Sequence, residues 1–255
     1  MSIDSMIDRP TPIERRGNLW LKRDDLYRVA GVCGGKARAC WELSQGAVGL
    51  VTGSVRRSPQ QQIVSRVAYE LKVPCRIHTA TGSYTEEMEY AKSYGAKIFQ
   101  HKMGYSGVLA ARARNDAAEM KYTHIPFGME SYVAVQCTRR QVKGLPDCKR
   151  IVITLGSGIS CAGLLWGLHD LGLRIPVVGI RVGGGQHGNS IIRRLDKFAP
   201  KNWRLRMEIV KASVPYEKPV EAELSGLRLD SHYESKCAEF LRDDDLFWIV
   251  GIRSE

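Results

Sequence analysis

A lysine follows two glycines at Gly34-Gly35-Lys36, between a strand-like run at residues 19–25 and a helix-like run at residues 37–44. Two glycines let the backbone turn tightly and come close to a ligand. The lysine would then lie in the first turn of the helix, where the dipole favours a neutral, nucleophilic amine. Such an amine can form a Schiff base with an aldehyde cofactor. Taken alone, the stretch has a simpler interpretation as a solvated surface lysine beside a turn.

A second glycine turn follows the apolar run at residues 150–155 and precedes a helical pattern at residues 162–168. A strand, a glycine turn and a helix start are typical of a phosphate cradle, because backbone N–H groups point inward and the helix dipole favours an anion. The turn lacks the lysine of a P-loop, and Cys161 breaks the GxGxxG pattern, although a dinucleotide fold stays open. The residues of this turn are Gly156, Ser157, Gly158, Ile159 and Ser160.

Ser58 and Pro59 precede apolar residues that recur at helical spacing over 63–71. Serine suits the N-cap of a helix and proline suits its first position. The N-terminus of that helix would offer N–H groups to an anion. Ser58 is therefore either a helix cap alone or a cap that also contacts a bound anion.

Strand and helix patterns alternate along the chain. Their lengths imply parallel sheets with crossover helices. Strands are expected at 49–54, 74–80, 96–101, 125–129, 150–155, 176–182 and 246–252. Helices are expected at 63–71, 85–94, 108–121 and 131–143.

The composition, with 44% hydrophobic and 25% charged residues over 255 positions, is that of a soluble globular protein. The sequence has no apolar run as long as a membrane span and no signal-peptide core, so we expect a cytoplasmic protein. Seven cysteines without metal-type spacing and six scattered histidines indicate reduced thiols and no metal site. The net charge of +11 favours polyanionic partners, although basic enzymes that bind no nucleic acid share it.

The segment Thr11-Pro12-Ile13-Glu14, residues 19–25 and the Gly34-Gly35-Lys36 turn together resemble the opening of pyridoxal-phosphate enzymes of the tryptophan synthase β fold, or fold type II. The resemblance extends to about residue 253. It lies near the branch of 1-aminocyclopropane-1-carboxylate (ACC) deaminase and D-cysteine desulfhydrase. The chain also resembles short pyridoxal-phosphate enzymes that phages encode beside genes for thymine hypermodification.

The resemblance implies an α/β fold of two parallel-sheet domains with the cofactor in the cleft. The larger domain would hold residues 1–46 and 144–255, and the smaller would hold residues 47–143. Members of this fold are usually homodimers, an expectation that rests on analogy.

The resemblance also assigns roles to cofactor-binding residues. Lys36 would hold pyridoxal 5'-phosphate as an internal aldimine, and the glycine turn at 156–160 would hold the cofactor phosphate. Glu234 matches a glutamate that pairs with the pyridine nitrogen, where a carboxylate keeps the ring protonated and able to draw electrons from the substrate Cα. Tyr233 matches a tyrosine beside the substrate.

Ser58 matches a serine that contacts the substrate and is followed in the deaminase branch by Asn and His. Pro59 and Gln60 stand in their place here. The contact that the Asn makes with the phenolic oxygen of the cofactor would then pass to Gln60 or Gln61.

The resemblance and the positive charge together leave three alternative functions open. The first is a decarboxylase or similar lyase acting on an amino acid attached to thymine in phage DNA, within the host cytoplasm. The second is a deaminase or desulfhydrase of a small free amino acid, and the third is a non-catalytic basic DNA-binding protein. In the first, a flipped-out base would bring the amino acid to the cleft. DNA phosphates would be contacted by residues such as Arg56, Arg57, Arg193, Arg194 and Arg204.

Overall fold

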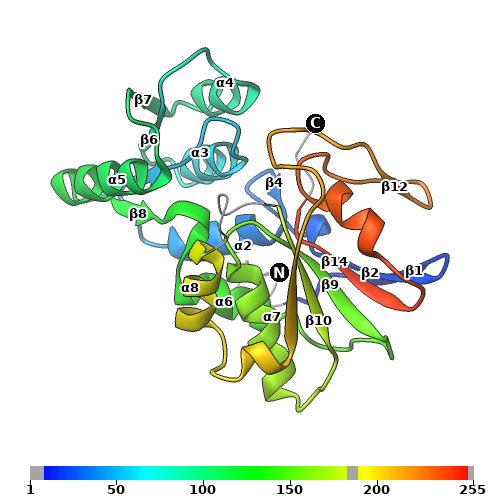
Figure 1. Ribbon diagram of the computed structural model, residues 1–255. Coiled ribbons are helices and arrows are strands. Elements are labelled where there is room, and N and C mark those ends of the chain that lie inside the picture. The colour runs from blue at the N-terminus through cyan, green and yellow to red at the C-terminus, as the bar shows by residue number, and fades with distance from the viewer. Residues whose placement is uncertain (1–8, 183–188, 252–255) are drawn as a thin grey trace. The chain divides into compact units, whose positions relative to one another are not determined.

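A computed structural model describes residues 9–182 and 189–251 (Figure 1). By their contacts, residues 9–27 and 134–251 form one compact unit (unit 1) and residues 28–133 form another (unit 2). The chain thus passes from one unit to the other after residues 27 and 133, whereas the expected domain boundaries lie after residues 46 and 143. The reason is packing: α2 (Gly35–Leu43) packs on α3 (Gln60–Glu70) in unit 2. Residues 134–143 belong to unit 1, where Gly163 lets α7 (Ile159–Asp170) approach their backbone closely.

Within the described residues, unit 1 is built on a six-stranded sheet, whose order is β1-β2-β14-β9-β10-β11. The first strand is antiparallel to its neighbour and all others run parallel. The strands are β1 (Ile13–Arg16), β2 (Leu19–Arg23), β9 (Arg150–Leu155), β10 (Val177–Arg181), β11 (Met207–Lys211) and β14 (Asp245–Ile249). The other elements are η1 (Asp24–Leu26), α6 (Tyr132–Arg139), α8 (Asn189–Phe198), η3 (Trp203–Leu205), the pair β12 (Glu223–Leu224) and β13 (Leu227–Arg228), and η4 (Glu234–Phe240).

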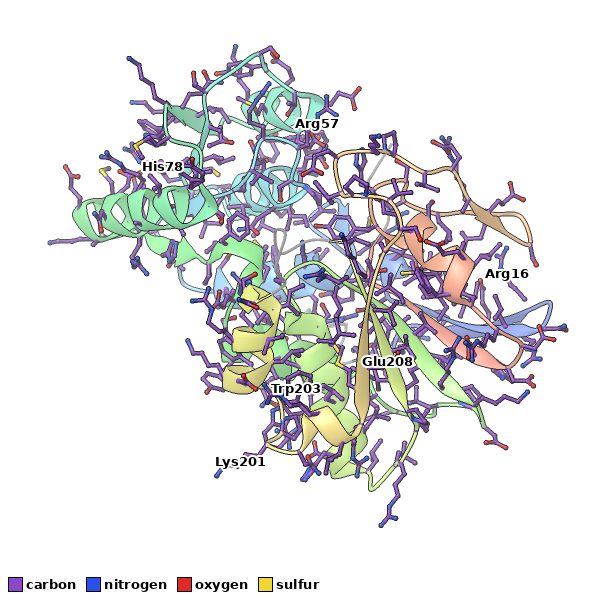
Figure 2. All side chains as sticks on the ribbon, in the orientation of Figure 1. Arg16, Arg57, His78, Lys201, Trp203 and Glu208 are labelled. Carbon is purple, nitrogen blue, oxygen red and sulfur yellow. The ribbon has the colours of Figure 1, made fainter. Side chains whose placement is uncertain are left out.

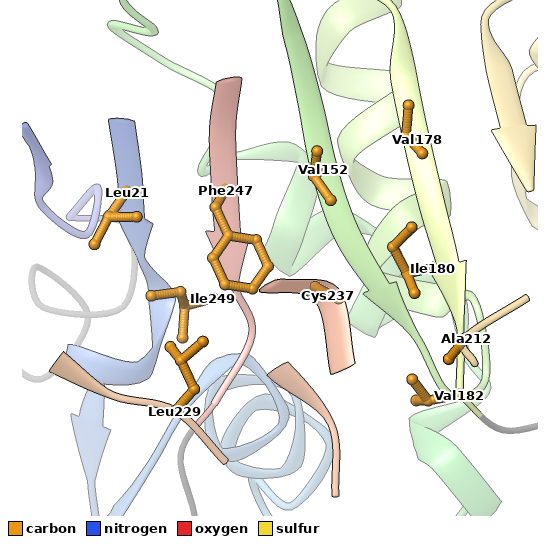
Figure 3. Close-up of a cluster of buried hydrophobic side chains, with 10 residues drawn as sticks. All are labelled: Leu21, Val152, Val178, Ile180, Val182, Ala212, Leu229, Cys237, Phe247 and Ile249. Atoms are coloured by element: carbon orange, nitrogen blue, oxygen red, sulfur yellow. The ribbon is translucent and has the colours of Figure 1, made fainter. Parts of the chain in front are cut away.

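The core of unit 1 lies on this sheet (Figure 3). Apolar side chains from β2, β9, β10 and β14 meet Leu229 and Cys237, which come from the segment around η4. Alternate residues of β9, such as Ile151 and Ile153, are also fully buried, so both faces of the strand are covered. Burial on both faces explains why β9 is almost continuously apolar in sequence.

Within the described residues, unit 2 holds a four-stranded parallel sheet in the order β7-β6-β5-β8. A Cβ on Gly53 would lie 2.5 Å from the Leu109 carbonyl oxygen, so this glycine permits the close approach of α5 to β5. The elements of the unit are β3 (Arg28–Val29), β4 (Val32–Cys33), α2, β5 (Leu50–Gly53), α3, β6 (Cys75–Ala80), α4 (Glu86–Ser93), β7 (Lys97–His101), α5 (Ser106–Met120), β8 (Thr123–Ile125) and η2 (Phe127–Met129).

The two parallel sheets confirm the α/β fold class, and three expectations need correction. The strand expected at 125–129 ends at Ile125 and continues as η2, because Pro126 has no N–H for the ladder. The helix expected at 131–143 ends at Arg139. The strand expected at 246–252 ends at Ile249, and residue 252 lies outside the described residues.

A polar cluster joins β6 and β7 to α5, and Figure 2 labels His78 within it. Asp116 on α5 accepts a hydrogen bond from Arg76 Nε at 2.7 Å and lies 2.8 Å from His78 Nε2. His78 Nδ1 in turn lies 2.9 Å from His101 Nε2, so the two facing nitrogens share one proton. Burial, the His78 ring and Arg112 all lower the pKa of His101.

This lowered pKa predicts a pH-dependent stability. Below about pH 6.5, the ordinary value for histidine, the unfolded chain binds the proton more readily than the folded one. The contribution of His101 to stability is therefore full above that pH and is lost on acidification through the lowered pKa of the folded state. Urea titrations between pH 7 and pH 5 should show a smaller loss in His101→Gln than in the wild type. Replacing the exposed His169 with glutamine is the control, and an equal effect of both substitutions would contradict the assignment.

Candidate active site

The glycine turn of unit 1 joins the carboxyl end of β9 to the start of α7. Gly158 has φ of 88°, in the left-handed region, and a Cβ there would lie 3.2 Å from Ile191 Cγ2. The first-turn N–H groups of a helix have no intrahelical partner, and they sit at the positive end of its dipole. The turn and the first turn of α7 therefore have the chemistry of an anion site.

Tyr233 lies against this turn. A Cβ on Gly156 would come within 3.0 Å of Tyr233 Cε1 and 3.2 Å of its Oη. The Asp230 carboxylate fixes the backbone of this tyrosine, since its Oδ1 accepts the N–H groups of His232 and Tyr233 at 2.9 Å each. Tyr216 packs edge-on against the Tyr233 ring, with centroids 5.2 Å apart. The phenol is thus held beside the predicted phosphate loop.

Glu234 is buried, with only 1% of its surface exposed. Its Oε1 accepts the N–H groups of Val250 and Gly251 at 3.2 and 3.3 Å, whereas Oε2 has no partner within residues 9–182 and 189–251. Burial, followed by repulsion from Asp230, raises the pKa of Glu234 to about 8. Near neutral pH the carboxyl therefore holds a proton that a basic nitrogen could share.

The turn and the carboxyl group lie at the same edge of the sheet. Residues 156–158 follow β9, and Val250 and Gly251, which hold Glu234, follow β14. These two strands are parallel neighbours. The carboxyl edge of a parallel sheet is where α/β proteins bind ligands. Unit 1 thus gathers the predicted phosphate loop, Tyr233 and Glu234 in one place.

In unit 2, Lys36 is the second residue of α2, which begins at Gly35. Gly34 precedes the helix with φ of 91°, so the turn needs a glycine there. The lysine side chain is half-buried. The sequence placed the helix start at residue 37, two positions late, and placed the lysine correctly near the N-terminus of the helix.

Ser58 lies at the start of α3, after the carboxyl end of β5. Its Oγ accepts the Gln60 N–H at 3.3 Å and its carbonyl oxygen accepts the Gln61 N–H at 3.2 Å. The N-cap residue is Pro59, so the helix begins one residue later than the sequence predicted for a Ser58 cap. The Gln60 side chain is buried and points into the unit, where it bonds to Thr52, Pro126 and Gly128. The site role predicted for Ser58 stays a prediction.

Comparison with solved structures identifies the fold. The chain is similar to a homologue of ACC deaminase, with a TM-score of 0.81 and 24% identity over 96% of this chain and 90% of the other. It is also similar to threonine deaminase isoform 2 from Solanum lycopersicum, with a TM-score of 0.66 and 12% identity over 100% and 91% of the two chains. The chain has the tryptophan synthase β-like fold. Maize serine racemase matches with a TM-score of 0.63 and 12% identity over 100% and 94%. No protein-family model and no curated protein matches the chain.

The two glutamines expected to replace the Asn of fold type II are both engaged elsewhere. Both hydrogens of the Gln60 amide are donated, to Thr52 Oγ1 and the Pro126 carbonyl, and its oxygen accepts the Gly128 N–H. Gln61 Nε2 donates to the carbonyls of Val55 and Arg56 at 3.0 Å each. Neither amide has an N–H left for a phenolic oxygen in this arrangement. Their expected cofactor contact is therefore not supported by these hydrogen bonds.

The arginines expected to contact DNA differ in their surroundings. Arg56 is held by the Ser83 carbonyl and hydroxyl, and a Cβ on Gly82 would clash with its guanidinium. Arg204 Nη2 donates to Asp196 at 2.9 Å, and Arg194 donates to the Ser190 carbonyl. Arg57 and Arg193 are exposed. Figure 2 shows Arg57 in unit 2, and shows Trp203 and Lys201 on the segment after α8.

Other features of the candidate site were not apparent from sequence. Asp230, which holds the backbone before Glu234, could have been inferred from the Asp-Ser pair, because Asp favours such local turns. The bonds of Gln60 to Thr52 and Gly128 join distant residues and had no sequence signal. Within the described part of the chain, no group of three or more His, Cys, Asp or Glu side chains could hold a metal ion. No helix in that part is both long and apolar enough to cross a membrane.

Proposed function

We propose that the chain is a pyridoxal-phosphate-dependent enzyme that breaks a bond at the Cα of a small free amino acid, as a deaminase or desulfhydrase. The fold supports this proposal, since the solved structures that this chain resembles include deaminases, racemases and ammonia lyases. One of them is by its own name a pyridoxal 5'-phosphate-dependent aspartate racemase, with a TM-score of 0.59 and 11% identity. Lys36 at the start of α2 offers an amine for attachment, and unit 1 offers the glycine turn for a phosphate and the buried Glu234 for a ring nitrogen.

The observation that carries the proposal is the buried Glu234 Oε2, which has no partner among the described residues. A buried carboxyl oxygen without a partner is costly, and its pKa of about 8 suits a shared proton with a pyridine nitrogen. The glycine turn and the α7 N-terminus at the same sheet edge suit a phosphate. The residues present therefore fit the cofactor.

When bound, pyridoxal phosphate supplies an electron sink for the bond broken at the substrate Cα. Glu234 would hold a proton at the ring nitrogen and strengthen that sink. The N–H groups at the start of α7 would bind the phosphate. Lys36 Nζ would attach covalently to the cofactor and later carry a proton to or from the substrate.

Two further residues would act on the substrate. Ser58 and the N-terminus of α3 would hold its carboxylate, because helix N-termini favour anions. Tyr233 Oη, held beside Gly156, would donate or accept a proton near the reacting carbon. A firm grip on the carboxylate favours loss of the amine or thiol over loss of carbon dioxide.

Trapping tests the attachment residue. We expect borohydride treatment of the cofactor-loaded protein to fix the cofactor on the peptide that contains Lys36, seen as a mass increase on that peptide. Lys36→Ala should lose both the trapped mass and the visible absorption band of the bound cofactor, because no other amine replaces it.

Lys102→Ala is the matched control, since it removes an exposed lysine of the same unit and should trap fully. Trapping on several lysines in the wild type, or unchanged trapping in Lys36→Ala, would contradict the proposal. A protein that binds no cofactor at all would favour the non-catalytic interpretation.

Substrate assays separate the two enzymatic interpretations. Release of ammonia and a 2-oxo acid from small free amino acids, D-cysteine and ACC among them, would support the proposal. The alternative, an amino acid attached to thymine in phage DNA, rests on the charge of +11 and the exposed Arg57 and Arg193. Turnover of modified DNA with inert free amino acids would favour that alternative.

A further inference from the structure

The buried amide of Gln60 joins the start of α3 to two distant parts of unit 2. Its Nε2 donates to Thr52 Oγ1 on β5 at 2.7 Å and to the Pro126 carbonyl at 2.9 Å. Its Oε1 accepts the Gly128 N–H at 2.8 Å. Thr52 Oγ1 passes its own hydrogen to the Ile125 carbonyl at 2.9 Å. We call these four hydrogen bonds the Gln60 latch.

Every polar atom of the Gln60 and Thr52 side chains is used in the latch. Both residues are buried, with 1% and 0% of their surfaces exposed. A fully satisfied buried network fixes geometry, whereas a partly satisfied one is costly. The latch therefore holds the segment from Ile125 to Gly128 in one position against β5.

The latched segment has a backbone that would not persist unaided. Gly128 and Met129 are consecutive left-handed residues, with φ of 66° and 60°. The second is not a glycine, and such a conformation is unfavourable for a residue with a Cβ. Met129 is nevertheless buried, and its N–H donates to the Pro126 carbonyl, the same oxygen that Gln60 binds. The latch thus stabilises a strained turn, η2.

The strained turn supports the helix that carries the lysine. η2 and β8 both pack against α2, whose second residue is Lys36. The inner face of α2 is buried through Ala37, Ala39 and Cys40, so the helix has no room to adjust independently. A shift of η2 would therefore be passed to α2, the helix that carries Lys36.

We propose that Gln60 is a positioning residue for Lys36, acting through η2 and α2, rather than a ligand of the cofactor. The inference rests on the proposed function for its catalytic meaning. Its structural part, the control of η2 and α2 by one amide, can be measured without cofactor. A misplaced attachment residue slows reactions even when the displacement is small.

The test compares Gln60→Met with Gln62→Met in the full-length protein. Methionine matches the length of glutamine and makes none of the latch bonds. Gln62 is the half-buried neighbour on α3, and no side-chain hydrogen bond is seen for it among the described residues. In cofactor-free protein, Gln60→Met should speed amide hydrogen exchange at η2 and the start of α2 by on the order of tenfold, the equivalent of about one lost hydrogen bond. Exchange in β9 should stay unchanged.

The second readout is the rate of borohydride-trappable attachment of pyridoxal phosphate to Lys36. We expect it to fall on the order of tenfold in Gln60→Met and to stay at the wild-type rate in Gln62→Met. Gln60→Glu should recover part of the rate at low pH, where a protonated carboxyl both donates and accepts, and lose it at high pH. Such a pH-dependent rescue is not expected from a general loss of stability.

The outcomes separate the two proposals. Unchanged exchange at α2, or an unchanged attachment rate in Gln60→Met, would overturn the positioning role. Equal effects of the two methionine substitutions would overturn it as well. Failure of the wild type to trap cofactor at Lys36 would instead remove the proposed function, whatever the exchange shows.

Discussion

Replacing Glu234 with glutamine is expected to lower turnover of the cofactor-loaded protein by about a hundredfold or more. Glutamine keeps the size of the side chain and can still accept the Val250 and Gly251 N–H groups at its oxygen. It carries no titratable proton, so it cannot keep a pyridine nitrogen protonated. The expected signature is a fall in kcat with little change in KM, because the proposed partner of Glu234 is the cofactor ring and not the substrate.

Glu239→Gln is the matched control for this substitution. Glu239 lies on the same short helix, η4, and is exposed to solvent. Its Oε2 accepts a hydrogen bond from the Ser213 hydroxyl at 2.9 Å. Its replacement should leave kcat within about twofold, as expected of a surface change. Wild-type turnover in Glu234→Gln would show that the buried carboxyl is structural and would remove the main support for the cofactor assignment.

The pH dependence of stability in the cofactor-free protein is a second, independent test of the Glu234 carboxyl. Its pKa is raised from 4.5 to about 8 by burial, followed by repulsion from Asp230. Between these values the folded state binds more protons than the unfolded one, so this group makes stability fall as pH rises. The contribution is fully present below about pH 4.5 and lost near pH 8. Glu234→Gln should therefore be more stable than the wild type at pH 8, by on the order of 1 kcal/mol, in urea titrations.

The sequence predicted the fold well because its signals are local and repeated. β9 and β10 are buried on both faces, so their apolar runs are unmistakable, and the glycines at 156 and 158 mark the turn that follows. Lys36 was placed at a helix start from two preceding glycines alone. The sequence did not predict β11, which has only one buried residue, Met207, and so lacks an apolar pattern.

Side-chain partners were beyond such reasoning. Gln60 was expected to face a cofactor because of its place in a motif, and the structure turns its amide toward Thr52 and Gly128. The run Arg23-Asp24-Asp25 was expected to be part of a strand, and it contains a buried ion pair at the strand end. In both cases the deciding contacts come from packing, which no single stretch of sequence encodes.

Replacing Arg23 with methionine is expected to lower the free energy of unfolding by about 3–5 kcal/mol. The Arg23 side chain is 7% exposed, and its Nη2 lies 2.7 Å from Asp25 Oδ2, in a carboxylate that is 4% exposed. Its Nη1 lies 2.6 Å from Glu14 Oε1. Methionine fills similar space but leaves the Asp25 charge buried without compensation, and an unpaired buried charge is far more costly than a missing surface pair.

Two further variants make this prediction specific. Arg16→Met removes a partner of the same Glu14 oxygen, at 2.8 Å, from a side chain that is 30% exposed, and should cost less than about 1 kcal/mol. Adding Asp25→Leu to Arg23→Met removes the stranded charge and should recover part of the lost stability, measured from urea midpoints with a constant slope. If Arg23→Met and Arg16→Met cost the same, the buried pair adds nothing beyond a surface contact. If Asp25→Leu instead destabilises Arg23→Met further, the loss comes from packing around β2, not from an uncompensated charge.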